Sequence, residues 1–150
     1  MQIWIDADAC PKVIKEIIFR AAMRTQTQAT LVSNHPLQAP LSPFIKKLQV
    51  AHGFDVADDE IIKNIAQGDL VITADIPLAD AVITRGATVL NPRGDVYTEH
   101  NIKHQLSIRN LHAELRSGGL ITGGPPKLSN RESQTFANAL DRFLTKGTRL

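Results

Sequence analysis

The stretch 69–80 limits the possible folds more than any other part of the chain. Residues 70–72 form a short apolar run, Leu-Val-Ile, between polar flanks, as is typical of a buried strand in a parallel sheet. Pro77 follows at a position where a helix can begin without losing a backbone hydrogen bond. Asp75 therefore stands at a strand-to-helix corner, and open α/β folds bind their ligands at this carboxyl edge of the sheet. Asp80 follows about one helical turn later and can return to the same rim.

Apolar runs and helical periodicity alternate through the first two thirds of the chain. Short apolar runs at 3–5, 29–32, 70–72 and 87–90 predict strands. Apolar residues that recur at helical spacing predict helices over 11–24, 58–67 and 77–85. This order predicts the α/β class, with a three-layer α/β/α domain and a mostly parallel central sheet.

The region 36–50 and the final third of the chain follow this pattern less directly. Three prolines within 36–43 predict a loop, and we expect a helical turn at 44–48 and a third short strand around Val50. A further helix is predicted over 98–116. After a glycine- and proline-rich loop at 122–127, Ser129 and Glu132 form a capping box that predicts the start of a last helix. The buried side of the helix 98–116 is predicted to comprise Ile102, Leu106, Leu111 and Leu115.

Length and composition indicate one folded domain spanning residues 1–150. Hydrophobic residues make up 43% of the chain and charged residues 21%, which is ordinary for a folded protein. We find no charged leader followed by an apolar core and no apolar run of membrane length. The single cysteine, Cys10, suits a reducing compartment and is expected to be a small buried side chain rather than a nucleophile. We therefore expect a cytoplasmic protein that has no membrane partner.

Charged residues are divided unevenly along the chain. Residues 1–75 hold seven Lys and Arg against nine Asp and Glu, whereas residues 76–150 hold ten against six. This division suits an acidic metal centre beside a basic surface that binds a polyanion. Chance scatter of surface charge explains it equally well.

Acidic residues gather where strands are predicted to end and helices to begin. Taken singly, Asp8 can form a turn or a cap, Asp59 can complement a helix dipole, and Asp75 can cap a helix. A parallel fold nevertheless brings Asp6, Asp59 and Asp75 to one rim, with Asp80 nearby. Carboxylates this close repel one another unless a cation neutralises them, and Mg²⁺ or Mn²⁺ prefers such oxygen ligands. Such a centre favours phosphoryl chemistry, because the ion holds a phosphate oxygen and lowers the pKa of a bound water.

Several motifs resemble those of known families. The run at 59–66, Asp-Glu-Ile-Ile-Lys-Asn-Ile-Ala, resembles the D-x-x-I-x-x-x-A helix of PIN-domain nucleases, and the run at 70–78 resembles their T-x-D-x-x-L strand end. Asp6 matches their opening aspartate. Over nearly its full length the chain resembles the YaiI/YqxD family, a PIN-like group of bacterial proteins whose function is largely unassigned. The motifs that carry this closer resemblance lie at 6–11, 71–79, 92–94 and 123–125.

The resemblance to PIN-domain enzymes implies a metal-dependent nuclease, in which acidic residues bind one or two divalent ions and cut RNA or DNA. On that pattern Asp6, Asp59 and Asp75 would hold Mg²⁺ or Mn²⁺. Asp8 and Asp80 would position a second ion or the attacking water. We expect the nucleic-acid partner and substrate to be RNA. Three basic residues near loops or a helix start are candidates for contact with its phosphates: Lys12, Arg93 and Lys127.

Two other functions fit some of the same residues. Asp6 and Asp8 after a strand also resemble the motif of haloacid dehalogenase-type phosphatases, in which Asp6 would be the nucleophile and Asp8 the general acid. Asp69 would then be a Mg²⁺ ligand. The third hypothesis is a PIN-like fold that binds RNA or another protein without catalysis. Trapping an aspartyl phosphate on Asp6 would favour the phosphatase, and metal-dependent cutting of RNA would favour the nuclease.

Overall fold

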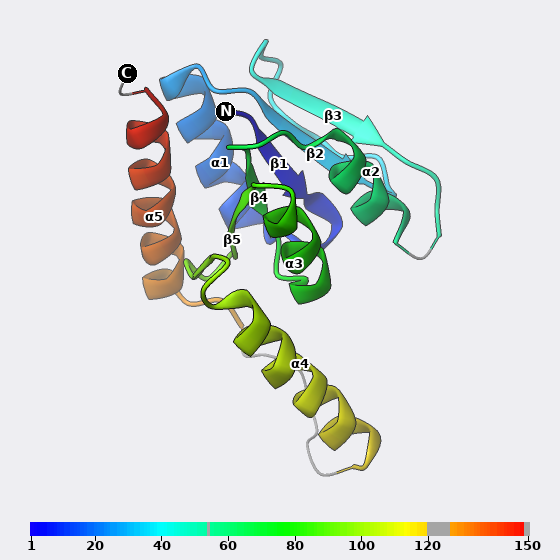
Figure 1. The fold of residues 1–150 in the computed structure, drawn as a ribbon. Coiled ribbons are helices and arrows are strands. Elements are labelled where there is room, and N and C mark those ends of the chain that lie inside the picture. Colours follow the sequence, from blue (N-terminus) through cyan, green and yellow to red (C-terminus); the bar gives the residue numbers. More distant parts are fainter. Residues whose placement is uncertain (54, 120–126, 149–150) are drawn as a thin grey trace.

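A computed structural model describes residues 1–53, 55–119 and 127–148 of the chain. Strands and helices alternate along it as the sequence predicts, so the α/β class is confirmed (Figure 1). The elements in chain order are β1 (Ile3–Asp6), the 3-10 helix η1 (Ala7–Ala9), α1 (Lys12–Thr25), β2 (Ala29–Ser33), β3 (Ile45–Gln49), α2 (Val56–Asn64), β4 (Leu70–Ile72), α3 (Ile76–Thr84), β5 (Thr88–Leu90), β6 (Val96–Tyr97), α4 (Ile102–Ser117) and α5 (Asn130–Thr148).

The described strands form one six-stranded sheet in the order β3-β2-β1-β4-β5-β6. β1 lies inside the sheet and runs parallel to both neighbours, so that Ile5 pairs with Leu31 of β2 and with Ile72 of β4. Among these strands β6 alone is antiparallel to its neighbour, β5. The sheet is therefore mostly parallel, and the carboxyl ends of β1 and β4 lie side by side.

Helices cover both faces of the sheet. Ile5 packs on one face in a core cluster that includes Phe136 of α5 and residues of α1. Successive side chains of a strand point to opposite faces, and Trp4 accordingly packs with Ile61 of α2 and Val82 of α3. Figure 1 shows α1 and α5 on one side of the sheet and α2 and α3 on the other. The three-layer α/β/α architecture is confirmed.

The edge strand β3 differs from the sequence prediction. Residues 44–48 were expected to form a helical turn, which is wrong, because Ile45 pairs with Ala29 in a parallel ladder. The ladder begins where the amide of Ala29 donates to the carbonyl of Phe44 at 2.8 Å. Pairing with a neighbouring strand outweighs weak local preference, and exposed lysines such as Lys46 suit the edge of a sheet. The two-residue strand β6 was not predicted.

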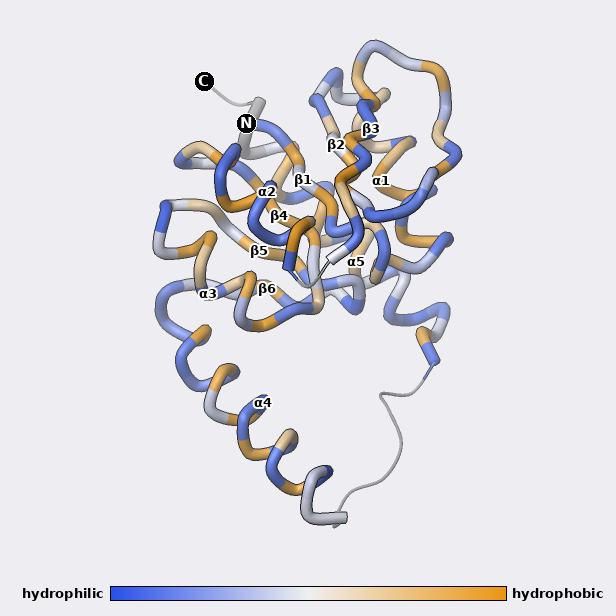
Figure 2. The backbone as a smooth tube through the Cα atoms, turned by 90° about the vertical axis from the view of Figure 1, so that its right-hand side faces the viewer, coloured by the Kyte–Doolittle hydropathy of each residue, from blue (hydrophilic) through white to orange (hydrophobic). Residues whose placement is uncertain are grey.

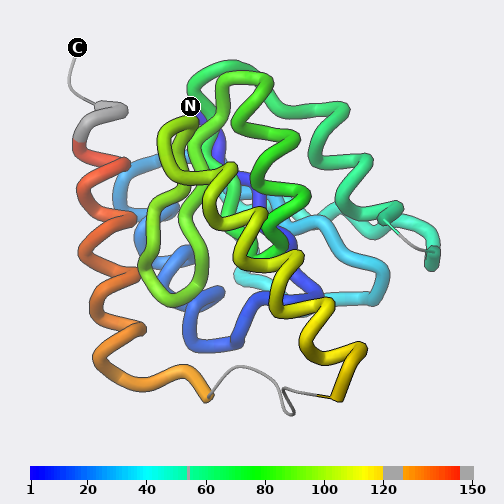
Figure 3. Tube along the Cα trace, turned by 60° about the horizontal axis from the view of Figure 1, so that its bottom comes forward, coloured from blue at the N-terminus to red at the C-terminus, as the bar shows by residue number. Residues whose placement is uncertain are grey.

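The helix α4 is far less buried than its apolar spacing suggests. Of the four residues expected on its buried side, Ile102 is buried, but Leu111 is 52% exposed and Leu106 and Leu115 are only partly covered. Figures 1 and 2 show α4 extending away from the sheet, and Figure 3 brings it forward across the carboxyl edge. Apolar spacing identifies a helix, but it does not say whether another element covers that helix.

The last helix begins as predicted, with a capping box. The amide of Ser129 donates to Oε1 of Glu132 at 3.0 Å, and the amide of Glu132 donates to Oγ of Ser129 at 3.2 Å. Of the loop predicted at 122–127, residues 122–126 lie outside the described residues. No helix in the described part of the chain is long and apolar enough to cross a membrane.

Candidate functional site

The carboxyl ends of β1 and β4 place Asp6 beside Thr73. Trp4 and Val71 are paired residues of these two strands, and both pack on the face covered by α2 and α3. Because side chains alternate between faces, Asp6 and Thr73, two residues further along each strand, point to that same face. The hydroxyl of Thr73 donates a hydrogen bond to Oδ2 of Asp6 at 2.9 Å. The strand pattern thus directs a carboxylate toward the starts of α2 and α3.

Asp75 occupies the corner between β4 and α3. Its side chain caps α3, with Oδ1 accepting a hydrogen bond from the amide of Leu78 at 3.0 Å. Its own amide donates to Oγ1 of Thr73 at 3.0 Å. The buried hydroxyl of Thr73 therefore connects Asp75 with Asp6 and fixes where both residues lie.

Asp58 of α2 is the third carboxylate at this corner. Burial, the nearby carboxylates of Asp75, Asp6 and Asp55, and a hydrogen bond with Asp75 raise the pKa of Asp58 from its ordinary 3.8 to about 7. A proton shared between Asp58 and Asp75 is the response expected of two carboxylates forced into contact. We refer to Asp6, Asp58 and Asp75 as the acidic cluster.

The pKa of Asp6 is raised as well. Burial raises its pKa, the hydrogen bond from Thr73 opposes that shift, and the carboxylates of Asp75 and Asp8 raise it further. Asp75 therefore makes it harder for both Asp6 and Asp58 to ionise, and a bound cation would relieve that repulsion.

The structure brings Asp58, rather than the predicted Asp59, to the acidic cluster. Asp59 is exposed, and neighbouring residues of a helix point about 100° apart, so only one of the pair can face Asp6. Asp58 stands three residues before Ile61, which is fully buried against the sheet, and this spacing places both on one side of α2. That helical phase was present in the sequence and would have identified Asp58.

The two auxiliary acids predicted from the sequence have other partners. Asp8 accepts a hydrogen bond from the amide of Asn34 at 2.7 Å, and its Oδ1 lies 3.2 Å from Nδ1 of His35. It therefore holds the loop after β2 to the carboxyl edge. Asp80 forms an ion pair at 2.8 Å with Lys103 of α4. Asp8 is near enough to raise the pKa of Asp6, whereas the contact of Asp80 is with α4, outside the acidic cluster.

Asp69 lies at the opposite edge of the sheet. Its carboxylate accepts hydrogen bonds of 2.9–3.1 Å from the amides of Gln2 and Ala66 and from the indole of Trp4. Gln2 precedes β1 whereas Asp6 ends it, so Asp69 and Asp6 are separated by about a strand length, on the order of 13 Å. Asp69 cannot share a metal ion with Asp6, which removes the Mg²⁺ ligand that the phosphatase hypothesis requires.

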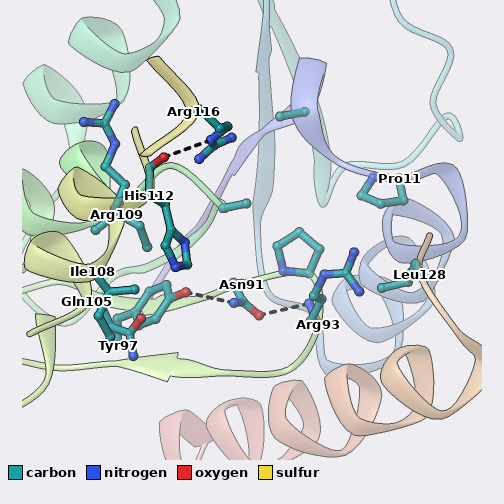
Figure 4. A pocket seen from close by; sticks show the side chains of 14 residues that line it. Pro11, Asn91, Arg93, Tyr97, Gln105, Ile108, Arg109, His112, Arg116 and Leu128 are labelled. Atoms are coloured by element: carbon teal, nitrogen blue, oxygen red, sulfur yellow. Dashed lines mark hydrogen bonds between the residues drawn. The ribbon is translucent and has the colours of Figure 1, made fainter. Parts of the chain in front are cut away.

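A cavity of about 680 Å³ opens between the carboxyl edge of the sheet and α4 (Figure 4). Arg93, one of the predicted phosphate contacts, lines the cavity and forms an ion pair with Glu132 at 2.6 Å. Lys12 and Lys127 are exposed but are not among its lining residues. Three basic residues of α4 that line the cavity were not predicted from the sequence, although their i, i+3, i+7 spacing marks one helix face: Arg109, His112 and Arg116.

The donor atoms of the acidic cluster are of the type that a divalent cation prefers, but their spacing is not that of a metal site. In the part of the chain that the structure describes, no three His, Cys, Asp or Glu side chains stand close enough together, as placed, to hold one ion. The carboxylates of Asp6, Asp58 and Asp75 nevertheless supply the hard oxygen atoms and the negative charge that Mg²⁺ and Mn²⁺ prefer. Cys10 is buried, and burial raises the pKa of its thiol to about 12, which agrees with the predicted structural role.

The fold and this edge define the chain as a three-layer α/β/α protein with an acidic cluster where its parallel strands end. The family described as "Uncharacterized BCR, YaiI/YqxD family" matches residues 4–146. Proteins similar to this chain include the UPF0178 proteins of Maridesulfovibrio salexigens and Dechloromonas aromatica. They are 59% and 60% identical to it over 146 residues, which cover 97% of this chain and 97% of each relative. A UPF0178 protein of Shewanella amazonensis is 57% identical over 146 residues, or 97% of this chain and 98% of its own. The chain therefore belongs to the YaiI/YqxD family, and no solved structure matches it.

Proposed function

We propose that this protein hydrolyses phosphodiester bonds in RNA with the help of Mg²⁺ or Mn²⁺. The observation that supports the proposal is the gathering of three carboxylates at one corner of the sheet, where Asp58 forms a hydrogen bond with Asp75 and lies near Asp6. Clustered carboxylates at the carboxyl edge of a parallel sheet are a common basis for metal-assisted chemistry. The resemblance to PIN-domain enzymes adds the expectation of a nuclease, and a cytoplasmic location is part of the same proposal.

The acidic cluster would hold the cation through residues whose positions are fixed to different degrees. Asp6 is held by Thr73, and Asp75 by the cap of α3, so both present oxygen atoms from set positions. Asp58 would complete the ligand set from α2. A bound ion would withdraw charge from a phosphate oxygen and lower the pKa of a nearby water.

The surrounding residues would orient the substrate and the water. Asp8 and Asp80 would position the water or a second ion after giving up part of their present contacts with Asn34 and Lys103. Arg93 lines the adjacent cavity, where its guanidinium would meet a phosphate. Lys12 and Lys127 are exposed and would contact phosphates further along the strand.

A second candidate function is RNA binding without cleavage. The observation that favours it is that, among the described residues, no three potential ligands converge on one point. Such a protein would keep the fold and the basic cavity, but would release RNA unchanged in the presence of Mg²⁺ or Mn²⁺.

Cleavage of a labelled single-stranded RNA, with Mn²⁺ or Mg²⁺ and with EDTA, separates the two candidates. The proposal expects metal-dependent cutting that falls by about a hundredfold or more in Asp75→Asn. Asparagine retains a side-chain oxygen that can cap α3, so the fold should survive. The matched control is Asp141→Asn on α5. It alters an exposed ion pair between Asp141 and Arg24 of α1, and this variant should cut like the parent. Cutting in EDTA, or full activity of Asp75→Asn, would contradict the proposal.

A further inference from the structure

The cavity beside the acidic cluster is lined from two sides. Figure 4 shows Arg93 and Pro11 on the side of the sheet, and Arg109, His112 and Arg116 on the side of α4. The three residues of α4 stand at i, i+3 and i+7, which places them on one helix face. The cavity is therefore a cleft, and α4, although little buried itself, forms one wall of it.

The cleft is positively charged. None of the described residues that line it is acidic, and three of them are arginines. Arg109 donates to Oδ1 of Asn110 at 3.1 Å, and Arg116 donates to the carbonyl of His112 at 3.3 Å. Neither arginine forms an ion pair within the described part of the chain, so both keep an uncompensated positive charge.

Apolar side chains also line the cleft. Pro92, Ile76 and Ile108 line the same cleft, together with Leu128 at the start of the last segment. A volume of about 680 Å³ lies within the range of sites that enclose a small organic ligand. Positive charge together with apolar surface in one cleft matches a chain of phosphates that carries flat, exposed bases.

The cleft also lies next to the proposed reaction centre. Two of its lining residues, Ala74 and Ala9, directly adjoin Asp75 and Asp8 in sequence. A strand held by Arg109 and Arg116 would therefore pass the acidic cluster as it leaves the cleft.

We infer that this cleft is a binding site for single-stranded RNA, with Arg109 and Arg116 in contact with its phosphates. The choice of RNA rests on the proposed function, whereas the charge and the apolar lining rest on the cleft itself. The strand must be single because bases that are paired with one another cannot stack on the apolar side chains that line the cleft. The projecting position of α4 is then explained, because one face of the helix serves the ligand rather than the core.

Fluorescence anisotropy with a labelled 12-nucleotide single-stranded RNA tests this inference without catalysis. The titration uses the full chain carrying Asp75→Asn, in EDTA, at several salt concentrations, with duplex RNA of the same sequence as competitor. In that background Arg109→Ala/Arg116→Ala removes two charges, and alanine, the strongest helix former, preserves α4. Arg20→Ala, at an exposed position of α1 that does not line the cleft, is the matched control.

The double variant should bind single-stranded RNA about tenfold more weakly, with a salt slope smaller by about 1.4 because each lost phosphate contact removes about 0.7. Arg20→Ala should leave both values unchanged, and duplex RNA should compete poorly. Equal binding by the double variant, an equal loss in Arg20→Ala, or equal affinity for the duplex would overturn the inference.

The assignment of the cleft as an RNA-binding site and the proposed hydrolysis can be refuted independently of each other. If the parent binds RNA through Arg109 and Arg116 but never cuts it, the proposed hydrolysis is wrong and the cleft assignment stands. If the parent cuts RNA and the double variant cuts and binds equally well, the cleft assignment is wrong and the hydrolysis stands.

Discussion

Replacing Asp58 with asparagine should stabilise the metal-free protein, and more so as the pH rises. The folded state raises the pKa of Asp58 from 3.8 to about 7, mainly through burial and then through Asp75 and Asp6. Below about pH 4 this carboxyl is protonated in both the folded and the unfolded state, so its charge does not lower the free energy of unfolding. As the pH rises from about 4 to about 7, the unfolded state loses this proton while the folded state keeps it, so the parent loses stability. Above about pH 7 both states are ionised and the loss stays constant.

The magnitude follows from the size of the shift. About three pKa units at 1.36 kcal/mol each would give about 4 kcal/mol for a fully buried group. Asp58 is only half-buried, and solvent screening reduces the expected effect to about 1–2 kcal/mol. Asparagine cannot ionise, so Asp58→Asn should gain this amount relative to the parent between about pH 4 and pH 8.

Urea unfolding in EDTA at several pH values between 4 and 8 measures the difference. The matched control is Asp59→Asn, which alters the exposed neighbour in the same helix turn and should show no pH-dependent gain. A flat difference for Asp58→Asn, or a rising one for Asp59→Asn, would refute the placement of Asp58 in the acidic cluster.

Three further changes test the fold around the site, each by urea or thermal unfolding. Phe136→Ala removes a fully buried ring that packs α5 on the sheet and should cost about 3–5 kcal/mol; a loss below 1 kcal/mol would mean that α5 is not docked there. Asp69→Ala leaves the amides of Gln2 and Ala66 without their acceptor and should cost about 1–3 kcal/mol while RNA cleavage persists, whereas selective loss of activity would reinstate Asp69 as a site residue. Gly94→Ala forces a Cβ to 2.6 Å from Thr135 at a φ of +98° and should cost at least about 1–3 kcal/mol; an unchanged midpoint would mean that this loop is not packed on α5.

The corner between β4 and α3 was predictable from the sequence because its causes are local. The apolar run before Thr73 and the proline after Asp75 specify a buried strand and a helix start within a few residues. Asp75 caps α3 at this corner, as the sequence predicts. Asp6 lies at the same corner because parallel pairing brings the ends of β1 and β4 together.

The remaining features depend on non-local contacts. Whether Asp58 or Asp59 faces Asp6 depends on the rotation of α2 against the sheet, and a motif match displaced by one residue selects the wrong side chain. Residues 44–48 become a strand only because β2 offers a free edge. The exposure of Leu111, and with it the wall of the basic cleft, depends on the absence of any described element over the later turns of α4, whose first turn packs on the domain through Ile102.

Calorimetric titration of Mn²⁺ into the metal-free protein tests the central claim, that Asp6, Asp58 and Asp75 together form a cation site. Saturable binding is expected for the parent, with loss or a large weakening in Asp58→Asn and retention in Asp59→Asn. Equal Mn²⁺ binding by both variants, or no binding by the parent, would contradict the claim.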